Sequence, residues 1–135
     1  MMDKAPVFEM ALTALPEHID VLGHVNNSVW IQWMEVVATA HWQAVAAPEH
    51  RAAYFWVIVR HEVDYLRPAH EGDRITARTW AEPPSGAKSV RNIEFLGNDG
   101  RPCVRARTQW AIIDKAVGRP IRVPLEVIAP FLSAD

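Results

Sequence analysis

The sequence predicts an α+β fold in which an antiparallel sheet of five strands wraps around one long central helix. Three observations lead to this prediction. The segment 28–46 contains neither Gly nor Pro and repeats its apolar residues close to helical spacing. Most of the remaining chain alternates apolar and polar residues, as half-buried strands do. Short Gly/Pro/Asn-rich turns separate several of these strands, and tight turns join antiparallel neighbours.

The composition indicates one globular domain spanning 1–135. Half of the residues are hydrophobic and 22% are charged, so the chain can bury a core without covalent staples. Cys103 is the only cysteine, which excludes an internal disulfide and a cysteine-based zinc site. The net charge of −2 gives no basic footprint for nucleic acid. Residues 1–16 match neither a signal peptide nor a membrane span, so we expect a cytoplasmic protein that binds no membrane.

The first half of the chain predicts one strand and the long helix. Residues 7–13 alternate weakly and form the first expected strand, which Pro16 ends, and a loop over 17–27 follows. The helix is expected over 28–46, and Pro48 closes it. Its apolar residues spread so widely around the circumference that we expect it to be buried on most sides.

The second half predicts strands joined by turns. Within 54–68, the alternation places Val57, Val59, Val63 and Tyr65 on one face of a half-buried strand. Further strands are expected at 74–81, 88–96 and 103–113, with turns at 83–86 and 98–100 and a short terminal helix at 124–131. Because no second layer of helices is available, the sheet must cover the long helix, which is the layout of the hotdog fold. The open edges of so small a sheet predict self-association.

The segment 20–35, with the sequence DVLGHVNNSVWIQWME, holds the candidate catalytic residues. Asn27 and Ser28 suit a helix start, because their short side chains can accept bonds from free backbone N–H groups. The start of a helix presents N–H donors and a partial positive charge, which suit a developing oxyanion. Asp20 is expected beside this site, and a carboxylate next to an oxyanion hole is the minimum requirement for acyl transfer.

The pattern D-x-x-G-H-x-N-N-x-x-W-x-x-W-x-E of residues 20–35 resembles the signature of hotdog acyl-CoA thioesterases of the 4-hydroxybenzoyl-CoA thioesterase type. Bacterial long-chain acyl-CoA thioesterases of that group are especially similar. The resemblance continues through V-D-Y-L-R-P-A at 63–69, G-D at 72–73 and G-x-K-S at 86–89, and so covers nearly the whole chain.

This resemblance implies hydrolysis of an acyl-CoA to free acid and CoA. It implies no metal and no cofactor other than the coenzyme A of the substrate. It also implies a homodimer or homotetramer in which the active sites lie between two subunits and the pantetheine arm follows the interface.

The resemblance assigns roles within the motif. The carboxylate of Asp20 is the general base or the nucleophile, and its expected negative charge at neutral pH allows both routes. The backbone N–H of Asn27 polarises the thioester carbonyl. His24 is either a second base or a residue that packs and holds the loop. Trp30 occupies the place where many members carry Tyr, so it keeps the bulk of that side chain and loses its hydroxyl.

Three further residues of the helix are candidates for the acyl pocket. Trp30 and Trp33 either form a flat aromatic slot or belong to the core. Glu35 lies two helical turns after the start of the helix and is the rival base, because another hotdog branch carries its catalytic carboxylate on the helix. Its alternative role is that of a buried structural acid.

Basic residues of the strands are candidates for binding the phosphates of coenzyme A. They are Arg60, Arg67, Lys88 and Arg91, with Ser89 next to the third of them. Lys88 and Ser89 have the best claim, since they follow a Gly turn that the resemblance includes. The alternative for the others is an ordinary solvated sheet face.

Three rival functions remain open. Acyl-carrier-protein thioesterases share the H-V-N-N core, but the Asn that follows their Asp by two residues is Leu22 here. A hotdog hydratase or dehydratase would use Asp20 together with His24 and release no thiol. A non-catalytic module would bind acyl-CoA without cleaving it.

Overall fold

The computed structural model describes residues 7–132, so the predicted domain of 1–135 extends beyond them at both ends. Its strands are β1 (Phe8–Thr13), β2 (Tyr54–Tyr65), β3 (Arg74–Ala81), β4 (Lys88–Leu96), β5 (Pro102–Asp114) and β6 (Arg119–Pro120). Its helices are α1 (Asn27–Val45), α2 (Pro48–Ala53) and α3 (Leu125–Ile128), with 3₁₀ turns at Pro16–His18 and Ala129–Phe131. Among the described residues no helix has both the length and the apolar character to span a membrane.

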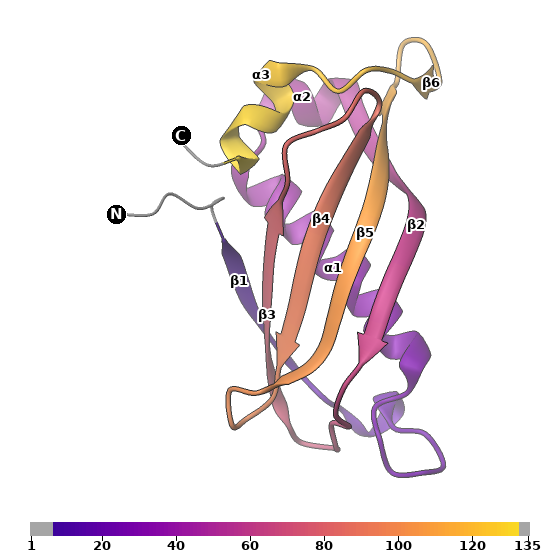
Figure 1. The fold of residues 1–135 in the computed structure, drawn as a ribbon, viewed down its shortest axis with the longest axis vertical. Helices are drawn as coiled ribbons and strands as arrows, with labels where there is room; N and C mark the ends of the chain where they lie inside the picture. Colours follow the sequence, from indigo (N-terminus) through magenta and orange to yellow (C-terminus); the bar gives the residue numbers. More distant parts are fainter. Residues whose placement is uncertain (1–6, 133–135) are drawn as a thin grey trace.

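The strands form one curled antiparallel sheet in the order β1-β3-β4-β5-β2, with β6 paired to β5. The antiparallel prediction is therefore confirmed, and the arrangement is consistent with the predicted hotdog fold (Figure 1). The sheet has six strands rather than five. The sixth, β6, spans two residues, and so short a strand has no alternation that a sequence could reveal.

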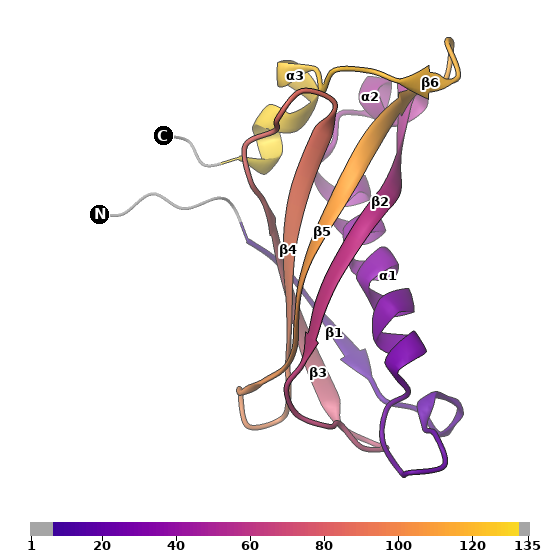
Figure 2. The same ribbon diagram turned by 45° about the vertical axis from the view of Figure 1, so that its right-hand side comes forward.

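Helix α1 lies along one face of the sheet (Figures 1 and 2). Its buried residues form a single stripe: Val29, Trp30, Trp33, Met34, Val37, Ala38 and His41. The opposite side is exposed, and Val36 on that side keeps 46% of its surface accessible. The expectation of a helix buried on most sides is wrong for the single chain, because the sheet covers only one side of α1.

The helix is fixed to the sheet by an aromatic cluster. The ring of Trp30 lies 5.2 Å from the rings of both Trp33 and Phe95, measured between centroids. Phe95 projects from β4 and is completely buried. Since aromatic side chains bury large areas, this cluster determines how the first half of α1 sits on the sheet.

Strand β2 contains a bulge that the alternation of its sequence does not reveal. Val57 pairs with Ala111 and Val63 pairs with Ala106 of the same strand β5, and the register shifts by one residue between Ile58 and Arg60. Since the two alanines lie on opposite faces of β5, Val57 and Val63 lie on opposite faces of β2. The prediction that they share a face is wrong, because the bulge inserts one unpaired residue.

Helix α2 is also absent from the sequence prediction. Pro48 was expected only to close the long helix, but α1 ends at Val45 and Pro48 starts α2. Pro is suited to the first position of a helix, since its missing N–H would have no partner there.

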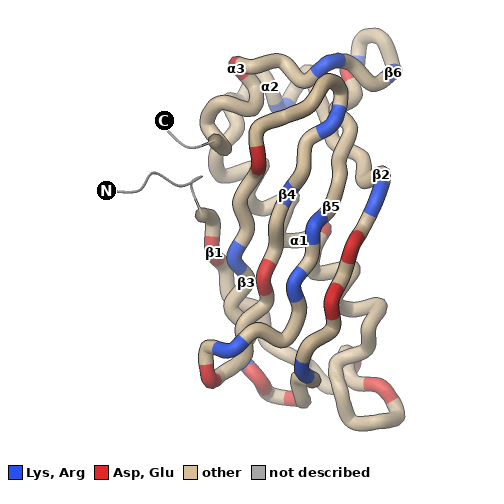
Figure 3. Tube along the Cα trace, in the orientation of Figure 1, with Lys and Arg blue, Asp and Glu red and all other residues tan. Residues whose placement is uncertain are grey.

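Acidic and basic residues are interspersed along the strands of the sheet (Figure 3). Cross-strand ion pairs join Arg78 to Glu9 at 2.9 Å and Arg105 to Glu94 at 3.2 Å. These acids and bases alternate across neighbouring strands, so this part of the surface carries no basic patch.

Replacing Phe95 by Ala tests the aromatic cluster. The substitution leaves a cavity under α1, and we expect it to lower the free energy of unfolding by about 3–5 kcal/mol in urea titrations. Phe55→Ala is the matched control, because Phe55 is 44% exposed. Equal losses in the two variants would contradict the cluster's role.

Candidate active site

Hydrogen bonds to the backbone and side chain of Asp20 hold the turn that precedes α1. The Asp20 N–H donates to the carbonyl of His24 at 2.8 Å, and the Gly23 N–H donates to the carbonyl of Asp20 at 3.0 Å. Gly23 has a φ of 83°, a conformation that Gly adopts without a steric penalty. The Oδ1 atom of Asp20 accepts from the N–H groups of Leu22 at 2.9 Å and His24 at 3.3 Å. Within residues 7–132, Oδ2 has no donor, so one oxygen of a fixed carboxylate is available for chemistry.

The start of α1 lies next to this turn. The helix begins at Asn27, one residue before the predicted start, and Asn26 is its N-cap. The Oδ1 atom of Asn26 accepts from the Ser28 N–H at 2.9 Å, which satisfies one free donor. The Asn27 N–H has no acceptor within residues 7–132. It is therefore a free donor at the positive end of the helix dipole.

Two backbone hydrogen bonds fix the loop, one to the segment that follows β2 and one to the 3₁₀ turn. The Val25 N–H donates to the carbonyl of Ala69 at 2.8 Å, and the Asn26 N–H donates to that of His18 at 2.9 Å. Val25 is also buried in the core. The turn and the helix start are therefore held in one fixed relation.

A pocket of about 350 Å³ lies between this loop and the end of β2. It is lined by Asp20, Leu22, His24, Val25, Asn26, Asn27, Trp30, Tyr65, Leu66, Arg67 and Pro68. Five of the predicted residues thus border one pocket: Asp20, His24, Asn27, Trp30 and Arg67. Trp33 lies behind Trp30 and packs edge-on against His18 with a centroid distance of 5.2 Å, so it supports the pocket from the core.

The opposite wall of the pocket includes two residues that the sequence analysis did not select. Tyr65 and Leu66 keep 45% and 47% of their surfaces exposed at the end of β2. In the sequence, the signal that could have revealed them is a pair of large, mainly apolar residues shortly before Pro68. Arg67, a predicted phosphate ligand, borders the same pocket and forms an ion pair with Asp99 at 2.9 Å.

The structure separates Glu35 from this pocket. Glu35 lies on the exposed side of α1, in a hollow bordered by residues 56–61 of β2 and by Trp110. Arg60 borders the same hollow and lies 3.9 Å from Glu62. Within one chain, therefore, neither Glu35 nor Arg60 reaches the group around Asp20.

The remaining predicted residues lie along β4. Lys88 is the exposed first residue of the strand, whereas Ser89 is 5% exposed and faces the interior. Arg91 points under the second half of α1, where its Nη1 atom lies 2.9 Å from His41 Nδ1 and 2.9 Å from Thr79 Oγ1. Ser89 and Arg91 therefore line one pocket under the second half of α1, and Lys88 is not part of it.

Burial determines the charges in this second group. Burial, with a smaller contribution from the positive charge of Arg91, lowers the pKa of His41 from 6.5 to about 4. Burial also lowers the pKa of Arg91 to about 10. At neutral pH His41 is neutral and accepts from a charged Arg91.

Within residues 7–132, no group of three or more His, Cys, Asp or Glu side chains is placed to hold a metal ion.

Comparisons with known proteins add a family and related structures. The family model described as "Thioesterase-like superfamily" matches residues 14–131. The Bacillus subtilis (strain 168) protein YneP, provisionally named an acyl-CoA thioesterase, is 24% identical over 106 residues, which cover 76% of this chain and 77% of that protein.

Two solved structures share the fold. A protein of Bacillus stearothermophilus, assigned by prediction as a thioesterase, is 23% identical with a TM-score of 0.82, over 93% of this chain and 94% of that chain. A thioesterase of Thermus thermophilus in complex with coenzyme A and zinc is 23% identical with a TM-score of 0.80, over 94% and 98% of the two chains.

The lowered pKa of His41 predicts a pH-dependent stability. An unfolded His takes up its proton near pH 6.5 but folded His41 does so near pH 4, so the unfolded state binds more protons between these values. We expect stability to fall as the pH drops from about 6.5 to 4, by on the order of 3 kcal/mol from this group. Urea titrations of the wild type and His41→Gln measure it, because Gln can accept from Arg91 but does not titrate.

The variant His41→Gln should lose much of this pH dependence, whereas His61→Gln, a substitution of an exposed His on β2, should keep it. Parallel profiles for the wild type and His41→Gln would contradict the assignment.

Proposed function

This chain belongs to the Thioesterase-like superfamily and is a thioester hydrolase, and we propose that it cleaves acyl-CoA thioesters to a free acid and coenzyme A. The observation that carries the proposal is that the Asp20 carboxylate and the free Asn27 N–H border one pocket. The provisional name of the YneP relative favours the same substrate class. The proposal includes the finer kinship with 4-hydroxybenzoyl-CoA-type thioesterases, which rests on the motif of residues 20–35.

In the proposed reaction the thioester carbonyl oxygen accepts from the Asn27 N–H. The helix dipole at this point stabilises the negative charge that develops on the oxygen. The Oδ2 atom of Asp20 has two possible roles. In one, it takes a proton from a water molecule while the water oxygen adds to the carbonyl carbon. In the other, it adds to that carbon itself and forms a mixed anhydride that water then hydrolyses.

Both routes end in the same bond changes. The carbon–sulfur bond breaks, its electron pair leaves with the CoA thiolate, and the thiolate takes up a proton. Thiolate is a good leaving group, so the site needs no strong acid on the sulfur side. The proposed chemistry uses only protein groups and water.

The other pocket residues position these groups. The His24 N–H helps to hold the Asp20 carboxylate, while its ring packs edge-on against His70 with a centroid distance of 5.2 Å. We propose that Trp30 forms a wall of the acyl site and that Arg67, at the pocket rim, is the best placed of the basic candidates to meet a CoA phosphate.

We further propose that the enzyme is a homodimer or homotetramer assembled through β2. This strand forms one edge of the sheet, and an edge presents unpaired backbone donors and acceptors. Val57 and Val59 are 37% and 51% exposed on it. Both the Asp20 pocket and the hollow of Glu35 border β2, so a partner on this edge would complete the walls of both.

Asp20→Asn tests the proposed role of the carboxylate. Asn keeps an oxygen that can accept from Leu22 and His24 but loses the charge, so we expect the turn to remain folded. Turnover should fall by ~10²–10⁴-fold. Thiol release from a panel of acyl-CoAs measures the effect and the chain preference together.

Glu35→Gln is the control and should reduce turnover less. If Glu35→Gln proves the more damaging change, the base is misassigned. A wild type that binds acyl-CoA without releasing thiol would contradict the hydrolase proposal. If the acyl-carrier-protein thioester were hydrolysed faster than the matching acyl-CoA, the substrate would be a carrier-bound acyl group instead.

Val59→Arg tests the proposed interface. A charge on the β2 edge should convert the assembly to monomers in light-scattering measurements, and turnover should fall because the pocket loses a wall. Val117→Arg is the matched control, since Val117 is 53% exposed in the turn before β6. An unchanged mass for Val59→Arg would place the interface elsewhere.

A further inference from the structure

A second pocket lies under the second half of α1, and it contains none of the residues to which the proposed hydrolysis assigns a role. Its volume is about 210 Å³, and its apolar wall is mainly aromatic: Trp42, Phe55, Trp56, Trp110 and Phe131. Trp42 comes 15 residues after Asn27, so at the rise of an α-helix the two sites are roughly 20 Å apart. The two pockets share no lining residue.

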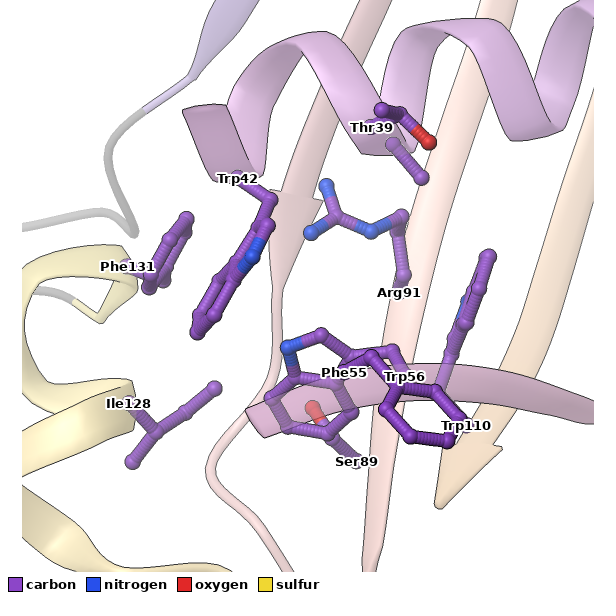
Figure 4. Close-up of a pocket in the computed structure, with 10 residues that line it drawn as sticks. Thr39, Trp42, Phe55, Trp56, Ser89, Arg91, Trp110, Ile128 and Phe131 are labelled. Atoms are coloured by element: carbon purple, nitrogen blue, oxygen red, sulfur yellow. The ribbon is translucent and has the colours of Figure 1, made fainter. Parts of the chain in front are cut away.

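Arg91 contributes the charge of this pocket. It is the single ionisable side chain among the described residues that line it. Figure 4 shows its guanidinium group with the rings of Trp42, Trp56 and Trp110 around it. Among the described residues, His41 and Thr79 are the side-chain partners of this group, and both contact Nη1. Within residues 7–132, the edge formed by Nε and Nη2 has no acceptor.

No acid within the described residues neutralises this guanidinium group. His41 is neutral at pH 7 and Thr79 carries no charge. Glu82, which follows β3, is bound instead to Arg107 at 2.9 Å and to Asn92 at 2.8 Å on the other face of the sheet. A charge that is partly buried without a counter-ion is unfavourable, and an anion that supplies one would remove part of that cost.

We propose that this pocket binds a small aromatic carboxylic acid, with its carboxylate on the Nε–Nη2 edge of Arg91 and its ring among the tryptophans. That edge of a guanidinium group presents two parallel N–H donors, which match the two oxygens of a carboxylate. The aromatic wall offers stacking and edge contacts to a ring. Within one chain, this site shares no residue with the Asp20 pocket.

Calorimetric titration of the whole protein with 3-phenylpropanoate tests the proposal. The neutral control is 3-phenylpropanamide, which has nearly the same shape and no charge. We expect the acid to bind about ten-fold or more tightly than the amide, because its carboxylate forms a charge-assisted pair with Arg91 and the amide forms only a neutral contact. In Arg91→Met the acid should bind no more tightly than the amide.

Asp20→Asn separates this site from the hydrolytic one, and it should bind 3-phenylpropanoate as the wild type does. Loss of binding in Asp20→Asn with retention in Arg91→Met would overturn the proposal, as would equal affinities for acid and amide or no binding of either. None of these results bears on thiol release from acyl-CoA.

A second variant covers the case in which Arg91→Met does not fold. Thr39 is exposed on α1 and borders the pocket, so Thr39→Trp should block it without changing the core. Gln32→Trp places the same ring on an exposed position of α1 away from the pocket. Binding of 3-phenylpropanoate should be lost only in Thr39→Trp, and equal binding in the two variants would contradict the proposed location.

Discussion

The closure of the 20–24 turn against the start of α1 is the constraint on which the proposed chemistry depends. Two backbone N–H groups fix one oxygen of Asp20, and the positive φ of Gly23 allows the chain to close on it. Asn26 then caps the helix and leaves the next N–H free. Since the loop is also bonded to Ala69, the carboxylate and the donor keep their relation without substrate present. Such preorganisation is what makes an oxyanion site effective.

The two ends of α1 offer different chemistry on one rigid element. At its start, a free donor and a carboxylate face an open pocket whose far wall comes from the end of β2. Under its second half, the partly buried guanidinium group of Arg91 borders an aromatic pocket. The Trp30, Trp33 and Phe95 cluster lies close to the first of these and anchors the helix to the sheet. The helix therefore positions one site and covers the other.

The elements that could be predicted from the sequence are those marked by local patterns such as flanking turn residues. Strand β4 was predicted with its bounds, since turn residues flank it on both sides, and the start of α1 was predicted to within one residue. The bulge at Val59 has no Gly or Asn signature, and β6 pairs only through tertiary contacts. Arg91 lies on the same face of β4 as Ile93 and Phe95, so alternation contained the signal of a buried arginine. Which basic residues border the Asp20 pocket depends on how distant strands pair in the sheet, and no local sequence pattern encodes that pairing.

The amide resonance of Asn27 reports whether this N–H donates to the thioester carbonyl. The probe is an acyl-CoA analogue in which a methylene group separates the carbonyl from the sulfur, so that it cannot be hydrolysed. On its binding to the ¹⁵N-labelled protein, the Asn27 N–H should shift downfield as it donates to the carbonyl, and Asp20→Asn should preserve that shift. If only resonances of residues around Arg91 shifted, and that of Asn27 did not move at saturation, the proposed role of the Asn27 N–H would be wrong.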